Sequence, residues 1–265
     1  MLTDSIGFAK KTLQDNKGFF LQLFTLGFIV NILPLILNHT SDSFFISPLL
    51  FGNAIVHFLF FIFIIKLSIH FYDSNKVEIS DLFTINIVLY LKLLGAVILI
   101  GIMSFLLMIL LPIPIIGPIL WVIFSIILSV NVCFVVYLII DDELGPLGAI
   151  FESMAIVSGH FGKLIMISFL SSFSGAVIVL VKDGIKELLI QEEISTIYSY
   201  FTSGFKHSLL MLDMGELSFL NRFLIKSIDS IFSLCTYIIG SLIMVYIYKR
   251  IKGDFRNRMG AKYSS

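Results

Sequence analysis

Six long apolar stretches constrain this 265-residue chain more than any other feature of its sequence. Crossing about 30 Å of hydrocarbon at about 1.5 Å per residue takes roughly 20 mostly apolar residues. Six stretches of about this length are present: 18–37, 48–68, 93–111, 119–140, 164–181 and 230–248. Within them only Lys66 is charged, and it lies near one end, where its ammonium can reach the lipid headgroups. The stretches predict an integral membrane protein.

The form of these stretches and the composition support the same conclusion. Charged residues make up 14% of the chain, against about 25% in typical soluble domains. The apolar runs are continuous rather than alternating, so helices are expected, because a backbone in lipid must satisfy its own hydrogen bonds. The first run is too long for a cleavable signal peptide and is expected to remain in the protein. We therefore predict an all-α protein with a single membrane domain over residues 1–265 and six transmembrane helices.

The positions of Lys and Arg predict the orientation of the chain in the membrane. With six spans, thirteen basic residues fall on the side that holds both termini, and five fall on the other side. Both termini are therefore expected in the cytoplasm. The residues expected to fix this topology and to meet anionic lipid headgroups lie in the tail: Lys249, Arg250, Lys252, Arg256 and Arg258.

The connection between the fourth and fifth stretches has the pattern of an amphipathic helix lying in the membrane interface. Its apolar residues recur at steps of three and four, whereas Glu152, Ser153 and His160 are expected on another face. The apolar set is Leu147, Ile150, Phe151, Met154, Val157 and Phe161. The acidic residues before it, Asp141, Asp142 and Glu143, suit a helix N-terminus, and Pro146 suits a first helical position.

Two further segments show a related pattern. Near the N-terminus Leu2, Ile6, Ala9 and Leu13 share one helical face, and residues 80–90 form a weaker copy that could continue into the third span. The chain then divides into three units of interfacial helix, span, hairpin and span, with Lys17, Lys92 and Lys163 at equivalent junctions. Either these units are a true structural repeat or their similarity is one of pattern only.

Polar residues inside the apolar stretches are the first place to look for a functional site. There are four candidates: Asn31, Asn53, His57 and Asn131. One hypothesis is a polar cavity that binds a solute or passes protons, with His57 as the titrating group. The other is hydrogen bonding between helices. We favour hydrogen bonding, because transporters usually add an intramembrane Asp, Glu or Arg and these stretches contain none.

Motifs of the common enzyme classes are missing from the sequence. The five histidines include no HExxH, and there is no GxSxG elbow, P-loop or GxGxxG after a strand. We therefore expect no catalytic residue, no metal site and no cofactor. The net charge of zero disfavours nucleic acid as a partner. Cys133 and Cys235 both fall in predicted spans, so buried thiols are expected rather than a disulfide.

The segment 182–229 separates the last two stretches and is expected on the outer, periplasmic side. It holds seven acidic and five basic residues, with apolar positions at helical spacing. The simpler interpretation is one or two short helices resting on the membrane surface. The alternative is an external cap or a docking surface for a membrane or periplasmic protein; the partner expected in either case is the lipid bilayer.

The segment LLPIPIIGPILWVIFSIILSVNVCFVVYLIIDDELGPLGAIFESMAIVSGHFGKL, residues 110–164, combines a Pro-Gly hairpin, a long span, an acidic-Gly turn and an amphipathic helix. This order resembles the YciC-type family of uncharacterised bacterial inner-membrane proteins, and LQDNKGFFLQLFTLGFIVNIL and IMVYIYKRIKG are similar to that family too. The resemblance implies a multi-pass protein of the bacterial inner (plasma) membrane and supplies no catalytic residue. We expect a non-enzymatic envelope protein of unassigned molecular function. The alternative is a transporter or lipid-handling membrane subunit with a polar intramembrane cavity.

Overall fold

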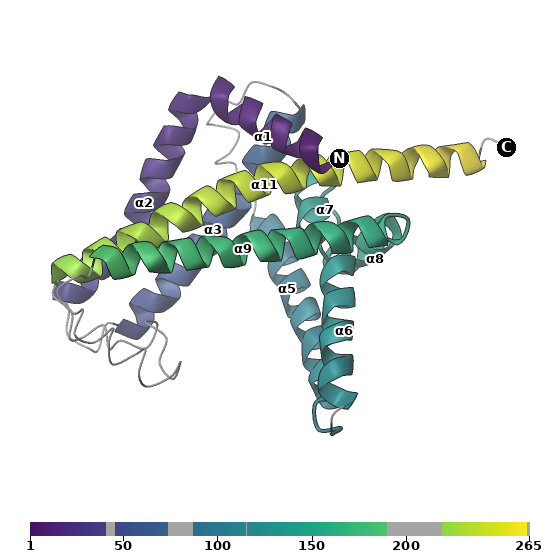
Figure 1. Cartoon of the computed structure of the whole chain (residues 1–265). Coiled ribbons are helices and arrows are strands. Elements are labelled where there is room, and N and C mark those ends of the chain that lie inside the picture. The colour runs from purple at the N-terminus through teal and green to yellow at the C-terminus, as the bar shows by residue number, and fades with distance from the viewer. Residues whose placement is uncertain (41–45, 74–86, 115, 190–218, 264–265) are drawn as a thin grey trace. The chain divides into compact units, whose positions relative to one another are not determined.

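The computed structural model describes residues 1–40, 46–73, 87–114, 116–189 and 219–263, and within these ranges the chain is helical and contains no strand (Figure 1). The prediction of an all-α protein is therefore confirmed for the described part of the chain. The helices form two compact units. The first unit comprises Met1–Thr12, Phe63–Ser171 and Gly240–Ser265, and the second comprises Leu13–Ile62 and Ser172–Ile239.

Most of the helices belong wholly or largely to one unit. The first unit contains α1 (Leu2–Asp15), α5 (Ile87–Leu107), the 3-10 turn η2 (Met108–Leu110), α6 (Ile116–Asn131), α7 (Val135–Asp141) and α8 (Pro146–Ser158). The second contains α2 (Lys17–Thr40). Three long helices contribute a section to each unit: α3 (Ile46–Asp73), α9 (Phe161–Leu189) and α11 (Phe219–Tyr263).

Four helical segments are long and apolar enough to cross a membrane: Val56–Asp73, Ile87–Leu110, Ile116–Asp141 and Phe223–Met259. Pro146–Ser158 and Phe161–Leu170 pass the same test together but meet at a bend of 98°, so they add a fifth span if the pair is counted as one. Lys17–Ile32 is a shorter apolar helix. Several helices that could span a membrane are thus present, whereas six spans and a threefold repeat are not confirmed by the described residues.

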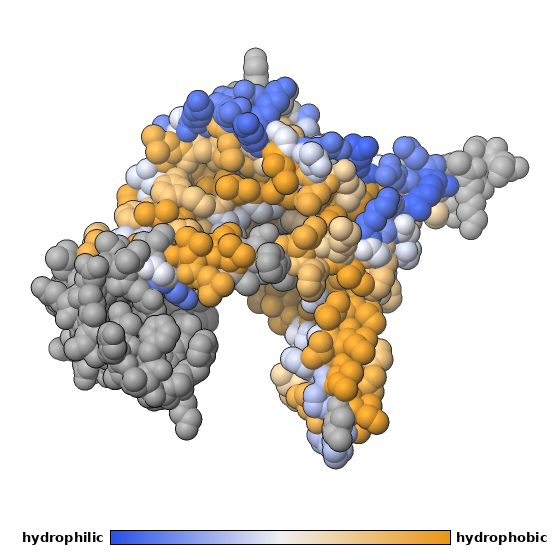
Figure 2. All heavy atoms as spheres, viewed as in Figure 1, coloured by the Kyte–Doolittle hydropathy of each residue, from blue (hydrophilic) through white to orange (hydrophobic). Residues whose placement is uncertain are grey.

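The hairpin of α5 and α6 is the most apolar part of the first unit (Figure 2). Many of its large apolar side chains are exposed, and Phe105 and Ile109 are about two-thirds exposed; a large exposed apolar surface of this kind is typical of contact with a membrane or a partner. The chain turns back tightly between the two helices because Gly117, at the start of α6, has no side chain and lies against the backbone of Leu110 in η2. A Cβ there would lie 2.0 Å from the carbonyl oxygen of Leu110. The hairpin therefore has a tight internal contact and an outer surface suited to lipid.

The core of the first unit lies where α5, α7 and α8 pack against one another. The large side chains that are fully buried in this unit come from α3, from α5, from α7 and the residue before it, from α8 and from the second half of α11. They include Leu93, Phe134, Leu138, Ile139, Ile156, Leu242 and Tyr248. This core surrounds the polar groups described below.

The interfacial segment expected at 146–163 consists of α8 and the start of α9, the one expected at 2–15 is α1, and the predicted apolar faces are partly buried and partly exposed. The buried residues of α8 are Ala149, Ile150, Ser153, Ile156 and Val157, whereas the large residues Leu147 and Phe151 are exposed. Small side chains allow two helices to approach closely, while large apolar ones can stay at a surface that lipid covers.

Small residues are also the buried ones in α1. There the buried residues are Ser5, Ala9 and Thr12, and Ile6 is half exposed. In the third segment, residues 80–86 lie outside the described part of the chain, and the remainder from Ile87 belongs to α5.

The second unit is held together by a close helix contact and an ion pair. A Cβ at Gly27 would lie 2.5 Å from the side chain of Leu234 and 2.7 Å from that of Phe60, so α2, α11 and α3 converge on this glycine. Lys182 of α9 forms a 3.0 Å ion pair with Asp229 of α11. Of the predicted outer segment, only its two ends are described, and both continue helices; residues 190–218 lie outside the described part.

Candidate functional site

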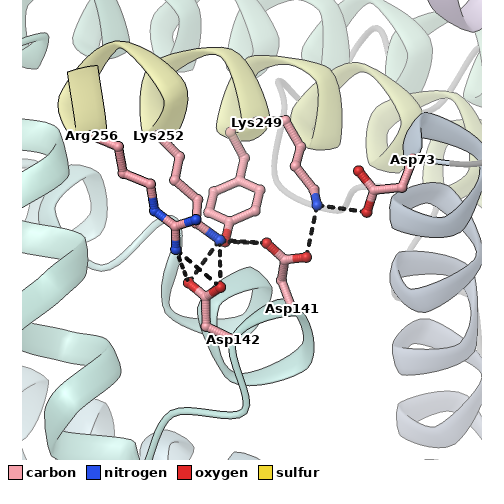
Figure 3. A network of polar contacts seen from close by, with 7 residues as sticks. Asp73, Asp141, Asp142, Lys249, Lys252 and Arg256 are labelled. Carbon is pink, nitrogen blue, oxygen red and sulfur yellow. Dashed lines mark hydrogen bonds and ion pairs between the residues drawn. The ribbon is translucent and has the colours of Figure 1, made fainter. Parts of the chain in front are cut away.

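Basic residues on one face of α11 meet acidic residues at the ends of two other helices. Lys249, Lys252 and Arg256 are separated by three and four positions, which places them on the same side of α11. Asp141 ends α7, Asp142 follows it, and Asp73 ends α3. Together with Tyr248 these six charged residues form what we call the ionic network (Figure 3).

Asp141 is the centre of the ionic network. One of its carboxylate oxygens accepts hydrogen bonds from the Tyr248 hydroxyl at 2.9 Å and from the Lys252 ammonium at 2.5 Å. Its other oxygen accepts from the Lys249 ammonium at 2.7 Å. Asp141 therefore has a partner on each oxygen, and all three donors come from one stretch of α11.

The two lysines extend the ionic network in opposite directions. Lys249 also donates to Asp73 at 2.7 Å and so joins the end of α3 to the end of α7. Lys252 also donates to Asp142 at 2.7 Å and to the Tyr248 hydroxyl at 2.8 Å. Arg256 donates to Asp142 at 3.3 Å. The ionic network thus connects α3, α7 and α11 within the first unit.

Burial makes the pairing obligatory. The side chain of Lys252 is 6% exposed and that of Asp141 is 11% exposed. A charge withdrawn from water to this extent is tolerated only when it is paired and hydrogen-bonded. The ionic network contains three carboxylates and three cationic groups, so the charges balance. Chemically it is a clamp between helices, since each charged group is engaged by a partner of opposite sign.

A second polar contact stabilises a break in the helix of the fourth apolar stretch. The helix is interrupted between Asn131, where α6 ends, and Val135, where α7 begins. The hydroxyl of Ser153 in α8 donates to the carbonyl of Asn131 at 2.6 Å and accepts from the backbone N–H of Phe134 at 3.3 Å. One buried hydroxyl therefore satisfies both a donor and an acceptor that the break leaves without a helical partner.

The bend between α8 and α9 holds a third polar group. Arg258 lies 3.2 Å from Nδ1 of His160, and Nε2 of His160 lies 3.9 Å from Asp254. A guanidinium can only donate, so Nδ1 accepts and the histidine is held in its neutral form. Burial, followed by the charges of Arg258 and Lys163, lowers the pKa of His160 below its usual value.

The five tail residues expected at lipid headgroups have different surroundings. Lys249, Lys252 and Arg256 belong to the ionic network, and Arg258 contacts His160. Arg250 is half exposed; it donates to the Tyr246 hydroxyl at 3.3 Å and lies 3.8 Å from Asp4. Contact of these residues with lipid stays a prediction, and the balanced charges leave Arg250 and Arg258 as the members best placed for it.

The four intramembrane polar residues are divided between the units. Asn31, Asn53 and His57 belong to the second unit, and Asn131 belongs to the first. The side-chain amide of Asn31 donates to the carbonyl of Gly27 at 2.9 Å, and that of Asn131 donates to the carbonyl of Ile127 at 2.9 Å. Both bonds lie within the residue's own helix. The side chain of Asn53 lies outside the described part of the chain. A cavity formed by all four stays a prediction.

The acidic turn has a different role from the one expected. Asp141, Asp142 and Glu143 were predicted as the N-terminal acidic residues of the next helix, but α8 begins at Pro146 after Gly145, without a side-chain cap. Asp141 and Asp142 bind α11 instead. Glu143 has a positive φ of 54°, and its carbonyl accepts a hydrogen bond from Lys92 of α5. The sequence shows two adjacent carboxylates here and three cations on one face of the last helix, but nothing in it indicates that the two groups meet.

We compared the chain with protein-family models, with curated protein sequences and with solved structures, and none of them matches it.

Proposed function

We propose that this chain is a non-enzymatic, multi-pass protein of the bacterial inner (plasma) membrane, with six spans and both termini in the cytoplasm. The observation that carries the proposal is the surface of the apolar helices. In Ile87–Leu110 and Ile116–Asp141 few residues are buried inside the protein, and large side chains such as Phe105 and Ile119 are exposed. An apolar surface of this extent is stable in a lipid environment, which supports the membrane assignment.

The helices α2 and α9 support the full set of six spans. Lys17–Thr40 contains the predicted first span, and Phe161–Leu189 contains the predicted fifth. Both are long enough to cross about 30 Å of hydrocarbon. The excess of basic residues on the side of the termini supports the orientation.

The ionic network supports a role without catalysis. A catalytic acid, base or nucleophile needs a free position toward a substrate and a protonation state matched to its task. In the ionic network the ammonium of Lys252 is enclosed by two carboxylates and the Tyr248 hydroxyl. This arrangement suits a structural role, in which the ionic network holds α3, α7 and α11 together.

Reporter fusions test the topology. A reporter that is active only in the cytoplasm is fused after Tyr263, and a reporter that is active only outside is inserted after Asn38 or after Pro114 in separate proteins. All three reporters are expected to be active. An inactive reporter after Tyr263 would reverse the orientation, and an inactive reporter after Asn38 would remove the first pair of spans.

Alkaline carbonate extraction tests the membrane assignment itself. The protein is expected to remain in the pellet with a known integral protein, while a peripheral protein is released. Release of this chain by carbonate would refute an integral membrane protein of any span number.

A further inference from the structure

The 98° bend between α8 and α9 gathers basic side chains from separate parts of the sequence. The guanidinium of Arg258 lies against Gly159, where a Cβ would come within 2.6 Å of it, and it also contacts His160. Lys163, on the first turn of α9, is exposed and lies near enough to His160 to influence its charge. The bend therefore presents two permanent cations, and the carboxylate of Asp254 lies 3.9 Å from Nε2 of His160.

An exposed apolar stripe continues from these cations along α9. Lys163 is followed at helical steps by Met166, Phe169 and Leu170, which are all exposed. Phe169 is 73% exposed and Met166 is 65% exposed. A cationic head followed by an apolar stripe matches the two parts of a phospholipid, whose phosphate is anionic and whose acyl chains are apolar.

The glycine at the bend contributes to this arrangement. Because Gly159 has no side chain, the Arg258 guanidinium can lie directly over the turn that joins the two helices. The guanidinium donates from Nε to the backbone carbonyl of Asp254 in α11 and from Nη2 to His160, and these two bonds hold it next to the start of α9. The positive charge of Arg258 is thus held at the bend by packing, although it sits at the end of a long, flexible side chain.

We propose that the α8–α9 bend binds an anionic phospholipid, with its phosphate at Arg258 and Lys163 and an acyl chain along Met166 and Phe169. The site depends on the proposed function, since the bend must lie at the headgroup level of the inner leaflet. In the proposed topology Lys163 directly precedes the fifth span, which begins at residue 164. A basic residue at that position meets the phosphates of the cytoplasmic leaflet.

Native mass spectrometry of the full-length protein tests the site. The protein is released from nanodiscs that contain equal amounts of phosphatidylglycerol and phosphatidylcholine, and the retained lipids are counted. The wild type is expected to retain phosphatidylglycerol preferentially. Lys163→Gln/Arg258→Gln is expected to weaken that retention about thirtyfold, because two basic side chains at an anionic surface are lost. The matched control is Lys10→Gln/Lys11→Gln, which removes two exposed lysines from α1 and should leave retention unchanged.

A second pair of measurements identifies the source of the phosphate. Met166→Ser/Phe169→Ser is expected to reduce phosphatidylglycerol retention while leaving both cations in place. An excess of inorganic phosphate is expected not to displace the lipid, since phosphate lacks acyl chains. Displacement by inorganic phosphate, together with full retention in the Met166→Ser/Phe169→Ser protein, would make the bend a free-anion site and overturn the proposal.

The outcomes separate this inference from the proposed function. If carbonate extraction releases the wild type, the membrane assignment fails and the lipid site fails with it. If the wild type is integral and Lys163→Gln/Arg258→Gln retains phosphatidylglycerol as the wild type does, the lipid site alone is refuted. Equal retention of phosphatidylcholine and phosphatidylglycerol by the wild type refutes it as well.

Discussion

Replacement of Lys252 by methionine is the most direct test of the ionic network. The substitution keeps most of the apolar stem but removes the ammonium that serves Asp141, Asp142 and the Tyr248 hydroxyl. Asp141 and Asp142 then share one cation fewer. Because the Asp141 side chain is only 11% exposed, water cannot fully replace the lost partner. Removing one partner of a buried ion pair typically costs about 3–5 kcal/mol.

The expected cost lies at the lower end of that range. Asp141 keeps its hydrogen bond from Lys249, and Asp142 keeps the contact with Arg256. We therefore expect Lys252→Met to lower the free energy of unfolding by about 3 kcal/mol, which corresponds to a fall of roughly 6–12 °C in Tm for a chain of about this size.

Thermal unfolding in nanodiscs measures this effect, with Lys11→Met as the matched control. Lys11 is exposed on α1, and its replacement is expected to change stability by less than about 0.5 kcal/mol. In Lys252→Met/Asp142→Asn one negative charge is removed along with the ammonium, and this protein should recover part of the lost Tm. A Tm for Lys252→Met equal to that of Lys11→Met would show that the ionic network does not hold the helices together.

Three further predictions follow from single contacts and can be checked by the same unfolding assay. Ser153→Ala removes the hydroxyl that bridges the helix break and is expected to cost about 1–3 kcal/mol, whereas Ser158→Ala, at the exposed end of α8, should be nearly neutral. Glu143→Gly relieves a φ of 54° and is expected to raise stability by about 0.5–1 kcal/mol; a lower Tm would contradict this. His160 has a pKa lowered by burial and by Arg258, so the unfolded chain takes up the proton first and stability should fall as the pH drops below about 6.5. His160→Gln should lack this part of the pH dependence, and an identical pH profile for the two proteins would refute the assignment.

Sequence reasoning predicted the helices well because apolar length alone determines them. A run such as 93–111 can satisfy its backbone in lipid only as a helix, and α5 with η2 covers it. The same reasoning could not find the break after Asn131, since Val132, Cys133 and Phe134 continue the apolar pattern without Gly or Pro. The break is stabilised by Ser153, a residue more than twenty positions away, and such a contact leaves no local signal.

The candidate site was only partly predictable for a related reason. Sequence position identified Lys249 and Lys252 as important but assigned them to lipid headgroups, since a basic tail after a last span is typical of such contacts. Their partners Asp73 and Asp141 lie more than 100 residues earlier in the chain. Pairing over that distance depends on which helix ends meet in the fold, and charge counting along the sequence carries no information about this.

The choice of buried faces has a common physical cause. Two helices surrounded by lipid gain little from placing leucine against leucine, because the hydrocarbon tails are equally apolar. What distinguishes the folded arrangement is close approach and hydrogen bonding. In the first unit the buried contacts accordingly use small hydroxyl residues, such as Ser68 and Ser241, whose oxygens lie 3.0 Å apart between α3 and α11. The large apolar residues Leu147 and Phe151 of α8 stay exposed while the small residues Ala149 and Ser153 are buried, and apolar periodicity alone does not show which of these sides packs against other helices.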